Sequence, residues 1–339
     1  MHPFMFERAE TPAAAVRAAA GARSGSALHN PAQFLAGGTT LLDLMKLDVM
    51  RPQTVVDINA LDGGALGRVE ATRGGVRLGA LVRMADAAEH PTIRRDCPMI
   101  AQSLELAASQ QIRNMASLGG NVLQRTRCGY FRDVSYAECN KRNPGSGCAA
   151  MNGVNREHAV LGASQQCIAT YPGDFAQALI ALDASVQTVG ADGGRTLRFA
   201  ALHRQPGNTP EVETALRPGE MIAAFDVALA PWMRRSLYLK VRDRESYEFA
   251  LASAAVALDL RDGRVADARI ALGGVATVPW RARTAEQALR GQAVDDASIA
   301  AAADTAFAEA RTHEHNAYKV ELGKQTLARA LRQAAALQI

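Results

Sequence analysis

The spacing of hydrophobic positions predicts short strands that alternate with helices over the first two thirds of the chain. Phe4 and Phe6, two residues apart, indicate a short strand, and an Ala-rich helix is expected from Thr11. Further strands are predicted at 55–58, 76–82, 185–189, 196–199 and 221–229, and further helices at 98–112 and 174–183. Turn residues bound these elements, and a boundary is predicted near Pro231.

The pattern after Pro231 predicts a separate, smaller module. Three strands are expected at 238–241, 254–260 and 265–272, and Asp262-Gly263 gives a hairpin signal between the last two. Three helices are expected next: one capped by Thr284 with Gln287 three residues on, one over 296–311 and one over 318–337. An antiparallel sheet packed on helices is the simplest α+β arrangement for this module.

Two glycine pairs interrupt the apolar pattern where a strand is expected to lead into a helix. Gly37-Gly38 is followed by Thr39-Thr40 and an apolar helix, which suits a diphosphate held by backbone N–H groups and a helix N-terminus. Gly119-Gly120 lies between Ser117 and Asn121 and is expected to leave N–H groups free for a ligand. An ordinary strand-to-helix connection is the alternative for each turn. No G-x-G-x-x-G or P-loop motif occurs, which disfavours a nicotinamide-binding fold.

Composition narrows the class of protein. With 339 residues, 48% hydrophobic and 21% charged, the chain is expected to be globular and to form more than one module. A formal net charge of +4 gives no support for nucleic-acid binding. No stretch reaches the roughly 18 apolar residues of a membrane span. Residues 1–8 lack the pattern of a signal peptide, so no export signal of its own is expected.

Four of the five cysteines fall between residues 128 and 167, and the fifth, Cys97, stands apart and is expected to be a small half-buried hydrophobe. The four thiols could form two disulfides or bind a metal, or their grouping in the sequence could be due to chance. Their intervals match neither a zinc knuckle nor the C-x2-C-x2-C run of ferredoxins. Their loop also holds residues that suit an anionic iron–sulfur cluster, namely Arg125, Arg127, Arg132, Lys141 and Arg142, with Gly129, Gly145 and Gly147 as N–H donors to sulfur.

The two glycine turns, followed by Gly173-Asp174, resemble the FAD-binding subunits of the xanthine dehydrogenase and molybdenum hydroxylase family over essentially the whole chain. The resemblance implies an α+β protein with a two-part FAD-binding domain of the PCMH type over 1–230, whose subdomains cover about 1–58 and 59–230. A C-terminal domain like that of the CO dehydrogenase flavoprotein follows over 231–339. The loop over 124–170 resembles that of bacterial periplasmic aldehyde oxidoreductases, whose FAD subunit also carries a [4Fe-4S] cluster.

The resemblance also assigns cofactor-binding residues and no catalytic residue. FAD would be bound by Leu35, Ala36, Gly37, Gly38, Thr39, Thr40, Leu41, Ala107, Ala108, Ala116, Ser117, Gly120, Asn121, Leu123, Asp174, Met221, Ile222 and Lys240. The cluster ligands would be Cys128, Cys139, Cys148 and Cys167.

The expected function is that of the electron-transfer subunit in a heterotrimeric molybdenum aldehyde oxidoreductase. A large subunit with a molybdenum cofactor would oxidise the aldehyde to a carboxylic acid, and a small subunit with two [2Fe-2S] centres would pass the electrons to FAD and on to an external acceptor. A periplasmic location is expected, by co-export with a partner that carries a twin-arginine signal; the cytoplasm is the alternative.

Three other functions stay open from the sequence. The chain could serve another molybdenum hydroxylase, of the xanthine dehydrogenase or aromatic acyl-CoA reductase type. A stand-alone flavin oxidase is disfavoured because the histidine that often attaches FAD covalently is absent from residues 36–42. A zinc-stabilised module without redox function would leave the glycine turns without a ligand.

Overall fold

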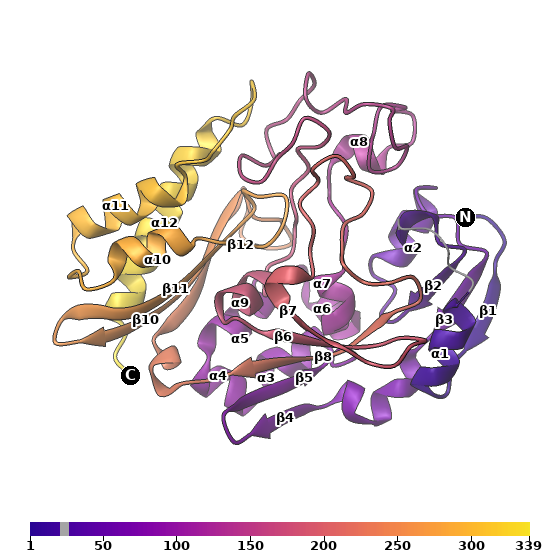
Figure 1. The fold of residues 1–339 in the computed structure, drawn as a ribbon, viewed down its shortest axis with the longest axis horizontal. Helices are drawn as coiled ribbons and strands as arrows, with labels where there is room; N and C mark the ends of the chain where they lie inside the picture. The colour runs from indigo at the N-terminus through magenta and orange to yellow at the C-terminus, as the bar shows by residue number, and fades with distance from the viewer. Residues whose placement is uncertain (21–26) are drawn as a thin grey trace.

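A computed structural model describes residues 1–20 and 27–339 and contains a small parallel sheet at the N-terminus (Figure 1). Its strands β1 (Met5–Arg8), β2 (Ala32–Leu35) and β3 (Thr54–Asp57) are arranged in the order β1-β3-β2. Helix α1 (Pro12–Ala19) and helix α2 (Leu41–Lys46) accompany this sheet. The predicted helix start at Thr11 is confirmed, because the Thr11 hydroxyl accepts from the N–H of Ala14 at 3.1 Å.

A second, antiparallel sheet follows in the order β4-β5-β8-β6-β7. Its strands are β4 (Val69–Thr72), β5 (Gly75–Gly79), β6 (Ser185–Val189), β7 (Thr196–Arg198) and β8 (Met221–Ala228). The accompanying helices are α3 (Met84–Glu89), α4 (Pro91–Asp96), α5 (Pro98–Glu105), α6 (Gln110–Met115), α7 (Leu118–Val122) and α9 (Phe175–Ala181). Phe225 of β8 packs edge-on against Phe175 of α9, with ring centroids 5.9 Å apart, so apolar side chains join the helices to the sheet.

The C-terminal module has the expected antiparallel sheet and three helices, at one side of the molecule in Figure 1. The sheet contains β9 (Ser236–Val241), β10 (Ala252–Arg261), β11 (Arg264–Gly273) and β12 (Trp280–Arg281), in the order β12-β11-β10-β9. The helices are α10 (Arg283–Leu289), α11 (Asp296–Ala306) and α12 (Tyr318–Ala336). The predicted hairpin between β10 and β11 is confirmed: Asp262 and Gly263 both have positive φ, 51° and 73°, as a tight two-residue turn requires.

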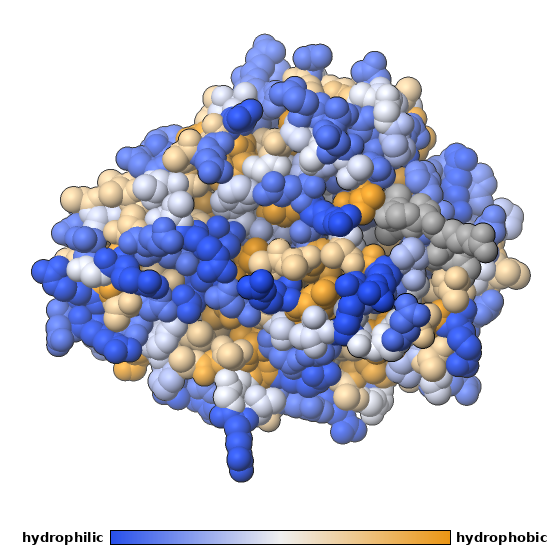
Figure 2. Space-filling model, in the orientation of Figure 1, coloured by the Kyte–Doolittle hydropathy of each residue, from blue (hydrophilic) through white to orange (hydrophobic). Residues whose placement is uncertain are grey.

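Short 3-10 helices connect several of these elements, at Ala27–His29, Asn59–Gly63, Ala65–Gly67, Phe199–Ala201 and Pro231–Arg234. The cap predicted at Thr284 is wrong, because α10 begins at Arg283 and the Thr284 hydroxyl donates to the Thr305 carbonyl instead. Helices α3 and α4 and strand β4 were not predicted, since they are short and carry little periodic signal. In the space-filling view, polar and charged residues are spread over the visible face with apolar patches between them (Figure 2).

The single helix predicted over 98–112 is wrong. The chain breaks after α5, Ala108 takes a positive φ of 51°, and the Ser109 hydroxyl caps α6 by accepting from the N–H of Ile112 at 3.3 Å. Alanine favours helices, but tertiary contacts override that preference here. The break frees the Leu106 carbonyl, which accepts hydrogen bonds from Lys240 at 3.0 Å and Arg242 at 3.1 Å, both from the C-terminal module.

Residues 124–170, which the structure describes throughout, form a long loop whose one α-helix is α8 (Gly129–Arg132). The loop lies between α2 and the near ends of α11 and α12 (Figure 1). Its last part is bonded to the C-terminal module: buried Asn316 donates to the Ala159 carbonyl at 3.2 Å, and the ammonium of Lys319 donates to the Glu157 carbonyl at 2.9 Å. The loop therefore has a fixed position without regular secondary structure.

We expect Asn316→Ala to destabilise the protein by about 1–3 kcal/mol, because it leaves buried backbone groups of the loop without partners. Denaturant unfolding measures the loss, and limited proteolysis should show faster cleavage within 124–170. Gln325→Ala is the matched control, since that amide is exposed on α12 and bonds only to Glu321. Equal effects of the two substitutions would contradict the anchoring role of Asn316.

Candidate functional site

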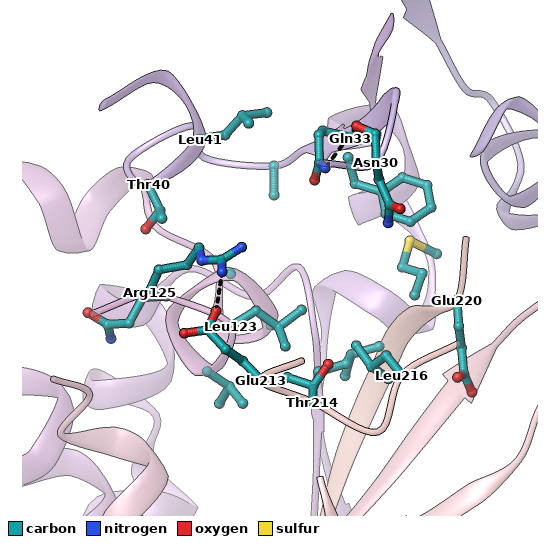
Figure 3. A pocket seen from close by; sticks show the side chains of 18 of the residues that line it. Asn30, Gln33, Thr40, Leu41, Leu123, Arg125, Glu213, Thr214, Leu216 and Glu220 are labelled. Atoms are coloured by element: carbon teal, nitrogen blue, oxygen red, sulfur yellow. Dashed lines mark hydrogen bonds and ion pairs between the residues drawn. The ribbon is translucent and has the colours of Figure 1, made fainter. Parts of the chain in front are cut away.

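A cavity of about 290 Å³ lies where the N-terminal part, the second sheet and the loop 124–170 meet (Figure 3). Many of the predicted FAD-binding residues line it, namely Ala36, Gly37, Gly38, Thr39, Thr40, Leu41, Ser117, Gly120, Leu123, Met221 and Ile222. Strand β8 and helix α7 position the last five, and the turn between β2 and α2 carries the others. The two glycine turns, distant in sequence, therefore face one cavity.

The turn at Gly37-Gly38 has the backbone geometry that a cofactor cradle needs. A Cβ atom on Gly37 would lie 2.0 Å from the Met115 carbonyl oxygen, and Gly38 has a φ of 73°. Thr40 precedes α2 but makes no capping hydrogen bond with its side chain. The turn thus packs closely on the segment before α7, and the Thr40 hydroxyl remains available to a ligand.

The turn at Gly119-Gly120 differs from the prediction, because its N–H groups are already bonded within the protein. Leu118 donates to the Val82 carbonyl at 3.0 Å and Gly119 to the Ala80 carbonyl at 2.8 Å. The N–H of Gly120 donates to the Ser117 hydroxyl at 3.2 Å. The prediction of free N–H groups in this turn is therefore wrong. The turn packs α7 against the end of β5, and its glycines line the cavity without side chains.

The remaining predicted residues lie outside this cavity. Leu35, Ala116 and Asn121 flank the glycine turns, and the Asn121 amide contacts the Met84 sulfur at 3.3 Å. Ala107 and Ala108 lie in the break between α5 and α6, and Asp174 and Lys240 lie where α9 meets β9.

Asp174 and Lys240 form a buried ion pair between the two modules. The Lys240 ammonium is 2.8 Å from one carboxylate oxygen of Asp174, and the Tyr238 hydroxyl donates to the other at 2.6 Å. Burial, and then the Asp174 charge, raises the pKa of Tyr238. Asp174 directly precedes α9 but makes no capping bond with its side chain. Tyr238 has no motif around it in the sequence, and its role emerges only from this contact.

A different group of charged residues lines the cavity itself and was not predicted as part of the FAD site. Arg125 Nη2 lies 2.6 Å from one carboxylate oxygen of Glu213 as an ion pair, and the Lys141 ammonium donates to the other oxygen at 2.8 Å. Burial acts to raise the pKa of Glu213, but the two cations outweigh it and the pKa is lowered. Arg125 and Lys141 both belong to the loop 124–170, so this loop forms part of the cavity wall.

All five cysteines are free thiols, which excludes the disulfide alternative for this structure. Cys97 lies in the apolar core beside the second sheet, where burial raises its pKa to about 12. It is a small hydrophobe as predicted, but it is fully rather than half buried. The backbones of Cys139 and Cys148 form an isolated antiparallel β-bridge. Cys128 and Cys167 lie near enough to these two residues for their thiols to interact electrostatically. The loop thus gathers the four thiols that the sequence grouped.

The surroundings of the thiols differ from those predicted. The N–H of Ala169 donates to the Cys167 sulfur at 3.4 Å, and His158 Nε2 lies 3.1 Å from the Cys128 sulfur. Gly147, predicted to donate to sulfur, donates to the Asn140 side chain at 2.9 Å instead. Neither Ala169 nor His158 was identified from the sequence, because neither belongs to a recognisable spacing.

The basic residues of the loop have protein partners in this structure. Arg127 and Arg132 pair with Asp43 of α2 at 3.2 Å and 2.6 Å, and Arg142 donates to the Phe131 carbonyl at 2.7 Å. These contacts hold the loop in place. Within the described ranges, no three His, Cys, Asp or Glu side chains are grouped so that they could hold a metal ion.

Comparisons with known proteins agree with this geometry. The FAD binding domain in molybdopterin dehydrogenase matches residues 3–228, and the CO dehydrogenase flavoprotein C-terminal domain matches residues 237–334. The aldehyde oxidoreductase FAD-binding subunit PaoB of Escherichia coli (strain K12) is 46% identical over 339 residues, 99% of each chain. The glyceraldehyde dehydrogenase medium chain of Sulfolobus acidocaldarius is 25% identical over 77% of this chain and 74% of its own length.

Solved structures show the same fold. A carbon monoxide dehydrogenase from Hydrogenophaga pseudoflava, which lacks the Mo-pyranopterin moiety of its cofactor, has a TM-score of 0.74 and 26% identity over 99% of both chains. The chain therefore belongs to the FAD-binding subunits of the molybdenum hydroxylases, a family of oxidoreductases. The predicted family and α+β fold class are confirmed. In the described ranges, no helix is long and apolar enough to cross a bilayer.

The cavity fits FAD, since it combines a glycine cradle, hydroxyl groups and cations. We expect Gly37→Ala to lower FAD retention strongly, because the added methyl group would collide with the Met115 carbonyl and displace the turn. Flavin absorbance after desalting measures the effect. Gly74→Ala is the control, because its Cβ would meet nothing within 4 Å. Full flavin content in Gly37→Ala would contradict the assignment of this turn.

Proposed function

We propose that the chain is the FAD- and [4Fe-4S]-carrying electron-transfer subunit of a heterotrimeric molybdenum aldehyde oxidoreductase. The identity of 46% over 99% of both chains with an aldehyde oxidoreductase subunit supports this substrate class. The observation that carries the proposal is the shared wall: the loop that gathers four free thiols also lines the FAD cavity. One segment thus serves two electron carriers.

FAD, when bound, supplies chemistry that the side chains lack, because it accepts electrons singly or as a pair. The turn over 37–41 would hold the diphosphate, and Ser117, Gly120 and Leu123 would line the opposite side. Met221 and Ile222 of β8 would give an apolar contact. Asp174 and Lys240, a buried ion pair that Tyr238 fixes outside the cavity lining, would lie near the polar edge of the flavin.

We assign the cluster ligands to Cys128, Cys139, Cys148 and Cys167. A single Zn²⁺ would need its sulfur ligands at about 2.3 Å from one point, and the described residues form no such group. A four-iron cluster binds one thiolate at each iron, so its ligands lie further apart than those of one ion. Free thiols in a fixed loop, with an N–H donor to Cys167 and His158 beside Cys128, suit such a cluster.

The remaining members of the complex would be a large subunit with the molybdenum cofactor and a small subunit with two [2Fe-2S] centres. Several relatives are named medium chains or FAD-binding subunits, which supports a place within such a complex. Electrons from aldehyde oxidation would reach FAD through the small subunit and leave to an external acceptor. Service in another molybdenum hydroxylase is the second candidate, favoured by 24% identity to a putative xanthine dehydrogenase FAD-binding subunit.

We expect Cys139→Ser to lower the iron content of the purified protein, because it removes one thiolate ligand of the proposed cluster. Cys97→Ser is the matched control and should leave the iron content unchanged, since Cys97 lies in the apolar core beside the second sheet. Elemental analysis of both variants gives the measurement. Equal iron loss from both, or stoichiometric zinc in place of iron, would refute the cluster.

We further propose that the complex works in the periplasm and that this chain is exported in folded form with a partner that carries a twin-arginine signal. Cofactors inserted in the cytoplasm would be lost if the chain crossed the membrane unfolded. Expressed with its partners, the chain should appear in the periplasmic fraction, and deletion of the partner's signal should retain the whole complex inside. Export of the chain without partners would contradict co-export and leave the FAD assignment intact.

A further inference from the structure

We propose that Arg125 and Lys141 form an anion subsite that binds a phosphate group of FAD, so that the cysteine loop itself contributes to flavin binding. The proposal rests on the assignment of the cavity to FAD. It concerns two residues that lie outside both glycine turns and that no sequence motif places at the flavin.

The charges of Arg125, Lys141 and Glu213 do not cancel. Arg125 and Lys141 are cationic and share the single carboxylate of Glu213, so the cluster of three carries one excess positive charge. The other charged residues on the cavity lining are Arg204, Glu211, Arg217 and Glu220, two of each sign, and they leave the excess unchanged. Because an uncompensated charge is costly to bury, an anion in the cavity would stabilise this arrangement.

Arg125 also has N–H donors that no protein atom in the described ranges accepts. The Arg125 side chain is only 7% exposed, and its Nε and Nη2 atoms are both buried without a hydrogen-bond acceptor among the described residues. The guanidinium lies over the Phe131 ring, 5.4 Å from the ring centroid, which restricts its plane. Figure 3 shows Arg125 at the cavity, on the same side as Thr40. A restricted guanidinium with an available N–H matches the geometry of a phosphate oxygen.

The start of the loop lies close to the glycine turn. Arg127, two residues after Arg125, pairs with Asp43 in the first turn of α2, directly after the glycine turn. This ion pair holds the start of the loop against the helix whose N-terminus faces the expected diphosphate. The turn at 37–40 and the two cations are therefore both placed to contact one diphosphate group.

Lys141 connects this subsite to the proposed cluster. It lies between Cys139 and Cys148, and its ammonium also donates to the Pro210 carbonyl at 3.1 Å. A change in the conformation of the thiol-bearing segment would move Lys141 away from the cavity. FAD should accordingly be held less tightly whenever the cysteine loop loses its native conformation.

The test measures the affinity of the whole complex, stripped of flavin, for FAD and for riboflavin, which has the flavin ring but no phosphate. Arg125→Gln and Lys141→Met should each weaken FAD binding by about tenfold, the effect of a loss near 1.4 kcal/mol, and leave riboflavin affinity unchanged. Arg281→Gln is the matched control: it breaks the buried Arg281–Glu286 pair of the C-terminal module, neither of whose residues lines the cavity, and should affect neither ligand.

Glu213→Gln gives the opposite prediction and separates charge from structure. It removes the carboxylate that shares the two cations, so FAD should bind as tightly as in the native protein or more tightly, with a steeper dependence on salt. Weaker FAD binding in Glu213→Gln, or equal loss of riboflavin and FAD in Arg125→Gln, would overturn the subsite. Failure of the native protein to bind FAD at all would instead refute the assignment of the cavity.

Discussion

Glu213 connects the wall of the FAD cavity to the cysteine loop over 124–170. Its carboxylate holds Arg125, before the first cysteine of the loop, and Lys141, between the second and third thiols. Both ion pairs lie at the wall of the FAD cavity, so one carboxylate joins two points of the loop to that wall. The loop can therefore keep a defined conformation with little secondary structure.

The two modules meet at a second buried charge pair. Asp174 belongs to the FAD-binding domain and Lys240 to the C-terminal module, and Tyr238 and the Leu106 carbonyl complete their hydrogen bonding. The break between α5 and α6 supplies that carbonyl. The position of the C-terminal module relative to the cavity thus depends on a local departure from helix geometry at Ala108.

The sequence could predict the elements that repeat a simple pattern. Strand alternation placed β6, β8, β10 and β11 closely, and the turn at Asp262-Gly263 placed the hairpin, because these signals are local. The gathering of the four thiols was expected from resemblance only, since their spacing carries no geometric rule. Contacts between distant segments, such as Glu213 with Lys141 or Tyr238 with Asp174, leave no local signal. The bonded N–H groups of Leu118 and Gly119 were mispredicted for the same reason, because their acceptors lie in a different strand region.

The central claim is that the chain carries FAD and a four-iron cluster held by the loop beside the flavin. EPR spectroscopy of the reduced chain, separated from its [2Fe-2S] partner, tests it most directly, together with iron and acid-labile sulfide determined per FAD. The account predicts the signal of a [4Fe-4S] centre, with about four iron and four sulfide for each FAD. A flavin-containing chain without iron and sulfide, or with zinc in their place, would contradict it.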